Sequence, residues 1–386
     1  MIAHNKPTIG VEEQNALQRV MNSGFLSQGK EVEKFEDEFC KYLGLTKQHA
    51  VAVSSGTAAL FLGLWALNSN KQKVVFPSYV CSAVRNAVAL SGGKESIIDS
   101  GKNTPNMDLK KIDKKSEKII IVPHMYGIPQ KINKIKNIKF IEDCAQSLGS
   151  KINNTFAGLQ GDLGTYSFYA TKMITSGGSG GMVVSKNKEM IDKIRDYREF
   201  DYRHDKKLRF NFQMTELQAA FGRVQLKKLP KFITRREQIF RTYRKNGLEL
   251  LDIKQDEIKK IKPVRYRAII KTNHQKKIFN MLKKAQIEAR IPIENWELLG
   301  KGKNFKNAYE LTKKTISLPI YPSLTNEEVE KILSVLAWIL RFKYTTYYEN
   351  LMVKRPNKKE NNFSEKVTDY FNSGMGDSFE KLNNFA

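Results

Sequence analysis

Lys172 is the residue in this chain best placed for covalent chemistry. It follows small, polar and aromatic residues and stands just before a glycine-rich turn, Gly177-Gly-Ser-Gly-Gly181. Those glycines let the backbone turn tightly and approach a ligand closely. A lysine amine that is partly shielded from water loses its proton readily and can attack a carbonyl to form a Schiff base. The plain alternative is a surface lysine beside a flexible loop.

Asp143 is a candidate acidic partner for that lysine. Lys139-Phe-Ile-Glu-Asp143 reads as a short apolar strand that ends in polar residues, and Gln146 follows closely. Ligands of open α/β sheets bind beyond the carboxyl ends of parallel strands. Pyridoxal phosphate (PLP) enzymes need a lysine together with an acidic group that keeps the pyridinium nitrogen protonated. Asp143 could equally be a cap for the turn that follows it.

A phosphate cradle is the third candidate feature. Ser55, Gly56 and Thr57 lie between a short apolar strand and an apolar-rich helix. The free amides and the positive dipole end of a helix N-terminus bind anions, and Gly56 permits close approach. Ser167 is a second possible phosphate donor. Ser and Thr also begin many helices as ordinary N-caps, which is the alternative here.

Six segments in this order resemble the sugar aminotransferases of the DegT/DnrJ/EryC1/StrS type, which have the aspartate-aminotransferase fold (fold type I). The resemblance covers roughly residues 7 to 341. The segments are Ser-Gly-Thr-Ala-Ala from Ser55, Pro77-Ser-Tyr79, Glu-Asp-Cys-Ala-Gln at 142–146, Gly-Asp-Leu-Gly-Thr-Tyr-Ser-Phe at 161–168, Lys172 before its glycines, and Phe-Asn-Phe-Gln-Met-Thr-Glu-Leu-Gln-Ala-Ala at 210–220.

The resemblance implies a role for each matching residue. Lys172 is the Schiff-base lysine, and Asp143 pairs with the pyridinium nitrogen. Asn211 reaches the phosphate of a neighbouring subunit's cofactor, which implies a homodimer. The ring-stacking position falls on Cys81 in a gapless match, with Tyr79 the nearest aromatic. The full expected cofactor-binding set is Ser55, Gly56, Thr57, Tyr79, Cys81, Asp143, Gln146, Ser167, Lys172 and Asn211.

The resemblance also implies an activity. It is the transfer of an amino group from L-glutamate to a keto-sugar, expected to be nucleotide-linked, in amino-sugar or surface polysaccharide biosynthesis. Two alternatives stay open: a PLP-dependent sugar dehydratase, against which Lys172 argues because such members carry histidine there, and a non-catalytic PLP-binding regulatory protein. Ser179 stands where many members have an acidic residue. Residues Arg290–Trp296 occupy the region where many members have a His-Tyr pair that shapes the sugar pocket. Both departures from the family pattern concern which sugar is bound.

The order of elements favours an α/β fold with a mostly parallel central sheet and flanking helices. We expect a large PLP-binding domain at 1–246, a smaller C-terminal α+β domain at 247–342, and an extra tail at 343–386 with one amphipathic helix at 363–371. The expected strands are 50–53, 73–76, 118–122, 138–142 and 264–271; the expected helical stretches are 8–45, 57–67, 79–90, 188–200, 214–246, 274–286 and one after the capping box Thr325–Glu328.

Composition sets limits on other functions. The chain has 386 residues, of which 40% are hydrophobic, and no stretch is long and apolar enough to span a membrane. Its start lacks the apolar core of a signal peptide, and three cysteines (Cys40, Cys81, Cys144) cannot all pair, so we expect a cytoplasmic protein without a metal site.

The formal charge is +26, and residues 223–307 hold 24 Lys/Arg against 8 Asp/Glu. No nucleic-acid recognition motif accompanies this excess, which favours a positive cleft for a nucleotide-linked sugar.

Overall fold

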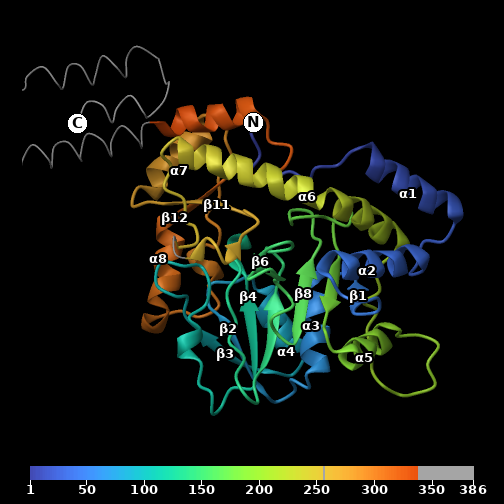
Figure 1. The fold of residues 1–386 in the computed structure, drawn as a ribbon. Coiled ribbons are helices and arrows are strands. Elements are labelled where there is room, and N and C mark those ends of the chain that lie inside the picture. The colour runs from blue at the N-terminus through green and yellow to red at the C-terminus, as the bar shows by residue number, and fades with distance from the viewer. Residues whose placement is uncertain (255–256, 338–386) are drawn as a thin grey trace, which may run out of the picture. The chain divides into compact units, whose positions relative to one another are not determined.

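The computed structural model describes residues 1–254 and 257–337. Residues Met1–Val335 form one compact unit, built around a seven-stranded sheet (Figure 1). In spatial order the strands are β1 (Ala50–Val53), β9 (Gly181–Val184), β8 (Leu163–Ser167), β5 (Lys139–Asp143), β4 (Ile119–Pro123), β2 (Lys73–Pro77) and β3 (Lys94–Ile98). All neighbouring pairs in this sheet are parallel except those of β9, which runs antiparallel to both β1 and β8.

Helices cover both faces of this sheet, which agrees with the continuous apolar runs of strands β1 and β4. Val51 and Val53 face the helices α3 (Gly56–Ala66), α4 (Ala83–Leu90) and α5 (Lys188–Arg198). Ala50 and Ala52 face the other side, where α2 (Lys30–Leu43) and α6 (Glu216–Lys245) pack. The expected α/β fold with a mostly parallel sheet is therefore confirmed.

The N-terminal helical stretch is divided in two. We expected one helical segment over 8–45, but the structure has α1 (Val11–Ser23) and α2, separated by a non-helical link. Gly24 ends α1 in the left-handed conformation with φ 70°, a conformation that glycine adopts without strain. Both helices contact α6, which runs in yellow from the side of α1 to that of α7 in Figure 1.

The C-terminal part adds small sheets and helices. β11 (Ala268–Lys271) and β12 (Thr315–Leu318) form an antiparallel pair, here called the C-terminal sheet. The expected capping box is present, because Thr325 and Glu328 exchange hydrogen bonds of 3.0 and 3.2 Å before a helix that begins at 326. The remaining elements are β6 (Lys151–Ile152), β7 (Thr155–Phe156), β10 (Ile261–Lys262), α7 (Gln275–Lys284), α8 (Lys306–Lys314) and 3₁₀ turns at Leu109–Lys111, Met125–Gly127, Asn295–Glu297 and Lys303–Phe305.

Two further expectations concern the C-terminal tail and membrane-spanning helices. The tail at 343–386, with its expected helix at 363–371, lies outside the described residues. Over the residues that the structure does describe, no helix is both long and apolar enough to cross a membrane.

Candidate active site

The predicted site residues follow the carboxyl ends of parallel strands, where ligands of open α/β sheets bind. Ser55 to Thr57 come after β1, and Tyr79 and Cys81 come after β2. Asp143 is the last residue of β5 and pairs in register with Thr165 of β8. Ser167 is the last residue of β8. The sheet therefore gathers at one edge residues that lie more than a hundred positions apart in the sequence.

Lys172 lies in the loop that joins β8 to the antiparallel β9. Its own amide donates to the Tyr169 carbonyl at 2.9 Å, and the Ala170 amide donates to the Gly178 carbonyl at 3.0 Å. Gly177 and Gly178 adopt φ values of 69° and 126°, which a side chain would strain. The Lys172 side chain is half-buried. The glycine-rich turn thus closes a hydrogen-bonded loop that holds Lys172 at the end of the sheet.

Asp143 has one engaged and one free carboxylate oxygen. Oδ1 accepts the Ala145 amide at 2.9 Å, which is the turn-capping contact that the sequence also allowed. Oδ2 has no hydrogen-bond partner among the residues that the structure describes. Burial raises the pKa of Asp143, and the Ala145 amide and the Lys172 ammonium oppose that rise. This carboxylate therefore lacks a close cationic donor, which a protonated ring nitrogen would supply.

The start of α3 forms a cradle with the end of β8. Ser55 is the N-cap, and its hydroxyl oxygen accepts the Ala58 amide at 3.1 Å. The amides of Gly56 and Thr57 make no hydrogen bond within the described part of the chain, so both are free for a ligand. A Cβ added to Gly56 would lie 2.7 Å from Cβ of Ser167. Gly56 and Ser167, far apart in sequence, are thus in direct contact, as a shared phosphate site requires.

The segment after β2 offers a thiol rather than an aromatic ring. Tyr79 is fully buried, and its hydroxyl lies 2.6 Å from that of Tyr126. Cys81 is exposed. Gln146, another of the expected cofactor-binding residues, accepts the Tyr126 amide through its Oε1 at 2.8 Å. Cys81 is therefore the side chain of this segment that is open to a ligand.

Asn211 is exposed and lies near the cradle of its own chain. Its Oδ1 accepts the Gln213 amide at 3.1 Å. The carbonyl of the next residue, Phe212, accepts the Ser54 amide at 2.8 Å. The backbone at Asn211 is thereby fixed next to the strand-to-helix turn that begins α3.

Tyr266 is a site residue that the sequence patterns did not reveal. The Lys172 ammonium lies 5.7 Å from the centre of its ring, and the guanidinium of Arg267 lies 5.4 Å from it. Burial alone would raise the pKa of Tyr266, but Lys172, Arg267, the Thr171 hydroxyl and Arg236 together lower it. Tyr266 precedes β11, almost a hundred residues after Lys172, so only the fold brings the two together.

A buried polar cluster lies directly behind Asp143. Ligand atoms of His124, Glu142 and Cys144 lie within 4.8 Å of one another, a spacing that a metal could use. However, Nε2 of His124 lies 2.8 Å from Glu142, and its Nδ1 accepts the Gln130 amide at 3.0 Å. Burial raises the pKa of the Cys144 thiol well above its ordinary value, so the thiol stays protonated. The cluster is a hydrogen-bonded support for the end of β5.

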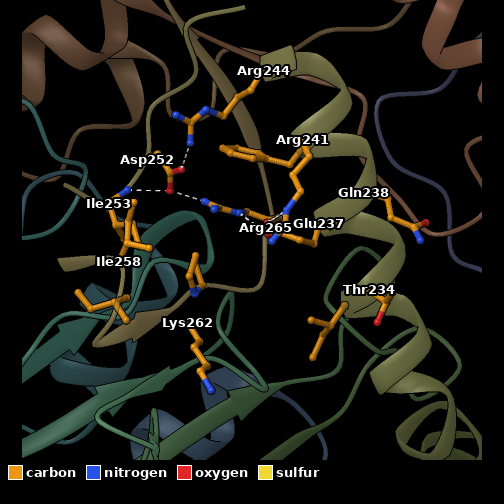
Figure 2. Close-up of a pocket in the computed structure, with 14 residues that line it drawn as sticks. Thr234, Glu237, Gln238, Arg241, Arg244, Asp252, Ile253, Ile258, Lys262 and Arg265 are labelled. Carbon is orange, nitrogen blue, oxygen red and sulfur yellow. Dashed lines mark hydrogen bonds and ion pairs between the residues drawn. The ribbon is translucent and has the colours of Figure 1, made fainter. Parts of the chain in front are cut away.

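One large cavity lies away from the predicted site residues. A cavity of about 790 Å³ lies between α6 and residues 252–253 and 258–265 (Figure 2), and none of the predicted site residues lines it. Asp252 bridges Arg244 and Arg265 there. The small cavity beside Lys172 holds about 10 Å³, room for about one water molecule. The candidate site is defined by its chemistry and not by an enclosed pocket.

Comparison with known proteins finds a family match. The model of the DegT/DnrJ/EryC1/StrS aminotransferase family matches residues 7–337. The GDP-perosamine synthase of Escherichia coli O157:H7 is 31% identical over 348 residues, which cover 84% of this chain and 94% of that protein. The dTDP-4-dehydro-2,3,6-trideoxy-D-glucose 4-aminotransferase of Saccharopolyspora spinosa is 31% identical over 270 residues, 63% of this chain and 70% of that protein.

A solved structure shares the fold. The aminotransferase TlmJ from Streptoalloteichus hindustanus superposes with a TM-score of 0.79 at 23% identity, covering 89% of this chain and 100% of that chain. Together with the family match, this likeness confirms the expected fold type. The chain belongs to the DegT/DnrJ/EryC1/StrS aminotransferase family.

Proposed function

We propose that this aminotransferase uses PLP to move an amino group from L-glutamate to a nucleotide-linked keto-sugar, as a homodimer. The observation that carries the proposal is the meeting of three features at one sheet edge. These are Lys172, the free oxygen of Asp143, and the cradle made by Gly56 and Ser167. A lysine, a carboxylate and an anion site are the groups that PLP requires.

The residues supply the groups that the cofactor needs. Gly56 lets the start of α3 lie against Ser167, because a Cβ there would come within 2.7 Å of the Ser167 Cβ. The unpaired amides of Gly56 and Thr57 and the hydroxyl of Ser167 would hold the phosphate. Asp143 would hold the ring nitrogen, and Gln146 and Cys81 would lie near the ring. When bound, PLP withdraws electrons from the carbon that carries the transferred amino group.

Lys172 has two successive tasks in this proposal. Its Nζ would hold the cofactor covalently, and once the amino donor has freed it, the amine would move a proton as general base and then as general acid. Tyr266 limits where Nζ can go, because the ring stands within 5.7 Å of it. An ionised Asp143 would hold the ring nitrogen in its protonated form. The same residues would serve the transfer to the sugar.

The acceptor class follows from the relatives' names and from charge. The two relatives named above act on GDP- and dTDP-linked sugars, and one name specifies position 4. The present chain carries a net charge of +26, which attracts a sugar linked to an anionic diphosphate. We therefore propose a nucleotide-linked 4-keto-sugar as the acceptor.

The test is a screen of GDP-, UDP- and dTDP-linked 4-keto-sugars with L-glutamate, read by mass spectrometry for an amino-sugar product. Lys172→Ala is the control and should form no product. Borohydride reduction of the loaded wild-type enzyme should fix the cofactor on Lys172. Attachment to a different lysine would refute the site. If the cofactor is fixed on Lys172 but none of these acceptors gives a product, the substrate class is refuted.

A further inference from the structure

The first residues of the chain form a strap, residues 2–8, that runs beside both the C-terminal sheet and the Lys172 loop. At its start, the Ile2 amide donates to the Gln286 carbonyl at 2.8 Å, and the Glu288 amide donates to the Ile2 carbonyl at 2.9 Å. These bonds fix the beginning of the strap to the segment that follows α7.

His4 fixes the strap to the C-terminal sheet itself. Its amide donates to Glu288 at 3.2 Å, and its Nε2 lies 2.9 Å from the hydroxyl of Ser317 in β12. Arg267, which precedes β11, donates to the same hydroxyl at 3.2 Å. His4 is buried, so these bonds are shielded from water.

The next residue, Asn5, makes the contact with the lysine loop. Its Nδ2 donates to the Thr171 carbonyl at 2.9 Å. That carbonyl belongs to the peptide that carries the Lys172 amide. Farther along, Gln225 of α6 donates to the Thr8 carbonyl at 2.9 Å, which fixes the end of the strap.

We propose that Asn5 is a positioning residue for Lys172. The inference rests on the proposed role of Lys172. Asn5 fixes the peptide before Lys172, and the Tyr266 ring lies beside the Lys172 side chain. Both residues that restrict Lys172 are thus tied to the C-terminal sheet. Without Asn5 this peptide keeps the bond from the Lys172 amide to the Tyr169 carbonyl but loses the bond to its own carbonyl. The peptide can then tilt, and Nζ spends less time where the proton must be moved. Small misplacements of a reacting group cost up to about 100-fold in rate.

The test compares Asn5→Ala and Asn5→Asp with Lys6→Ala. Asn5→Asp keeps the shape but replaces the donor with an oxygen that repels the Thr171 carbonyl. Lys6 is the exposed neighbour on the same strap and serves as the matched control. Both Asn5 variants should lower kcat roughly 10- to 100-fold with little change in KM. In the cofactor-free protein, they should speed hydrogen exchange of the amides at 169–176 while the melting temperature stays near that of wild type.

Two outcomes would overturn the inference. One is unchanged exchange at 169–176 in both Asn5 variants, which means that the contact does not hold the loop. The other is faster exchange with unchanged kcat, which means that the contact is only structural. Because exchange is measured without cofactor or substrate, its result stands even if borohydride fixes the cofactor elsewhere and refutes the proposed function.

Discussion

Asp143 and Lys172 are oppositely charged, yet each is positioned by neutral contacts. The Asp143 carboxylate accepts the Ala145 backbone amide. The pKa of this carboxyl group is raised because burial disfavours the ionised form more than Lys172 and the amide stabilise it. A buried carboxylate of this kind destabilises the protein when it has no cationic partner. The same property prepares it for the ring nitrogen of the cofactor.

We predict that Asp143→Asn separates stability from activity. Asparagine can keep the Ala145 bond through its oxygen but carries no charge. The cofactor-free variant should therefore melt at or above the wild-type temperature at pH 7, since the raised pKa shows that the ionised form is disfavoured. Its kcat should fall on the order of 10²–10³-fold, as for the loss of one electrostatic stabiliser at an active site. Near-normal turnover would show that Asp143 only caps its turn.

We predict that Gly56→Ala weakens cofactor binding. The new Cβ would lie 2.7 Å from Cβ of Ser167 and 3.3 Å from its Cα, so the cradle must open. Overpacking of this kind costs about 1–3 kcal/mol, which is roughly 5- to 150-fold in the Kd of PLP. Fluorescence titration measures it. Gly63→Ala on the same helix is the control, because its Cβ would meet Leu163 at 3.5 Å, an ordinary contact. Equal affinities in the two variants would refute the cradle.

At the scale of elements, the apolar runs predicted β1, β2, β4 and β5 to within a residue or two. They did not predict β8 or β9, the strands on either side of Lys172. Leu163-Gly-Thr-Tyr-Ser and Gly181-Met-Val-Val are short, contain glycine and lack a clear alternation, so their strand structure depends on neighbours in the sheet. β3, α8 and β12 were also missed, and none of them is longer than nine residues.

The candidate site shows the same limit. Local motifs identified Lys172, Asp143 and the turn at Gly56, because a glycine-rich turn or a strand end is visible within a few residues. Tyr266 and Asn5 have no such signal. Each lies near Lys172 only through contacts that span roughly a hundred residues or more of sequence, and no local pattern records these contacts.

The strap has a pH dependence that can be predicted. Burial, then the charges of Arg267 and Arg290, lowers the pKa of His4 from 6.5 to about 3. Between pH 6.5 and 3, His4 is therefore protonated in the unfolded chain but neutral in the folded chain. The free energy of unfolding falls as pH drops through this range. From pH 7 to 5 this contribution is roughly 2 kcal/mol.

Urea unfolding of wild type and His4→Gln at pH 7 and 5 measures this effect. Wild type should lose roughly 2 kcal/mol more stability between the two pH values than His4→Gln does. His204→Gln, which changes an exposed histidine, is the control and should behave as wild type. An equal loss in wild type and His4→Gln would show that His4 is not buried in its neutral form.

At the scale of the whole molecule, exposed apolar side chains gather near Asn211. Phe210 is 54% exposed and Leu208 is 89% exposed. Phe25 is 78% exposed, and its neighbour Leu26 accepts the Glu216 amide at the start of α6, a few residues after Asn211. Exposed apolar groups that lie together mark surfaces that other chains cover. This placement supports the homodimer that the family resemblance implies, with Asn211 at its interface.

We therefore predict that Asn211 serves the cofactor of the partner subunit. An isologous interface then places both sites of the dimer between the subunits. Asn211→Ala should lower PLP affinity while the dimer persists, as measured by sedimentation.

Lys172→Ala and Asn211→Ala are then mixed under conditions of subunit exchange. If Asn211 acts in trans, each site combines Lys172 of one chain with Asn211 of the other. One site of a hybrid dimer then carries both substitutions, and the other site carries neither. Random mixing should restore about a quarter of wild-type activity, because half of the dimers are hybrids with one intact site. If Asn211 acts within its own chain, every hybrid site keeps one lesion, and no activity above that of the separate variants returns after exchange is verified.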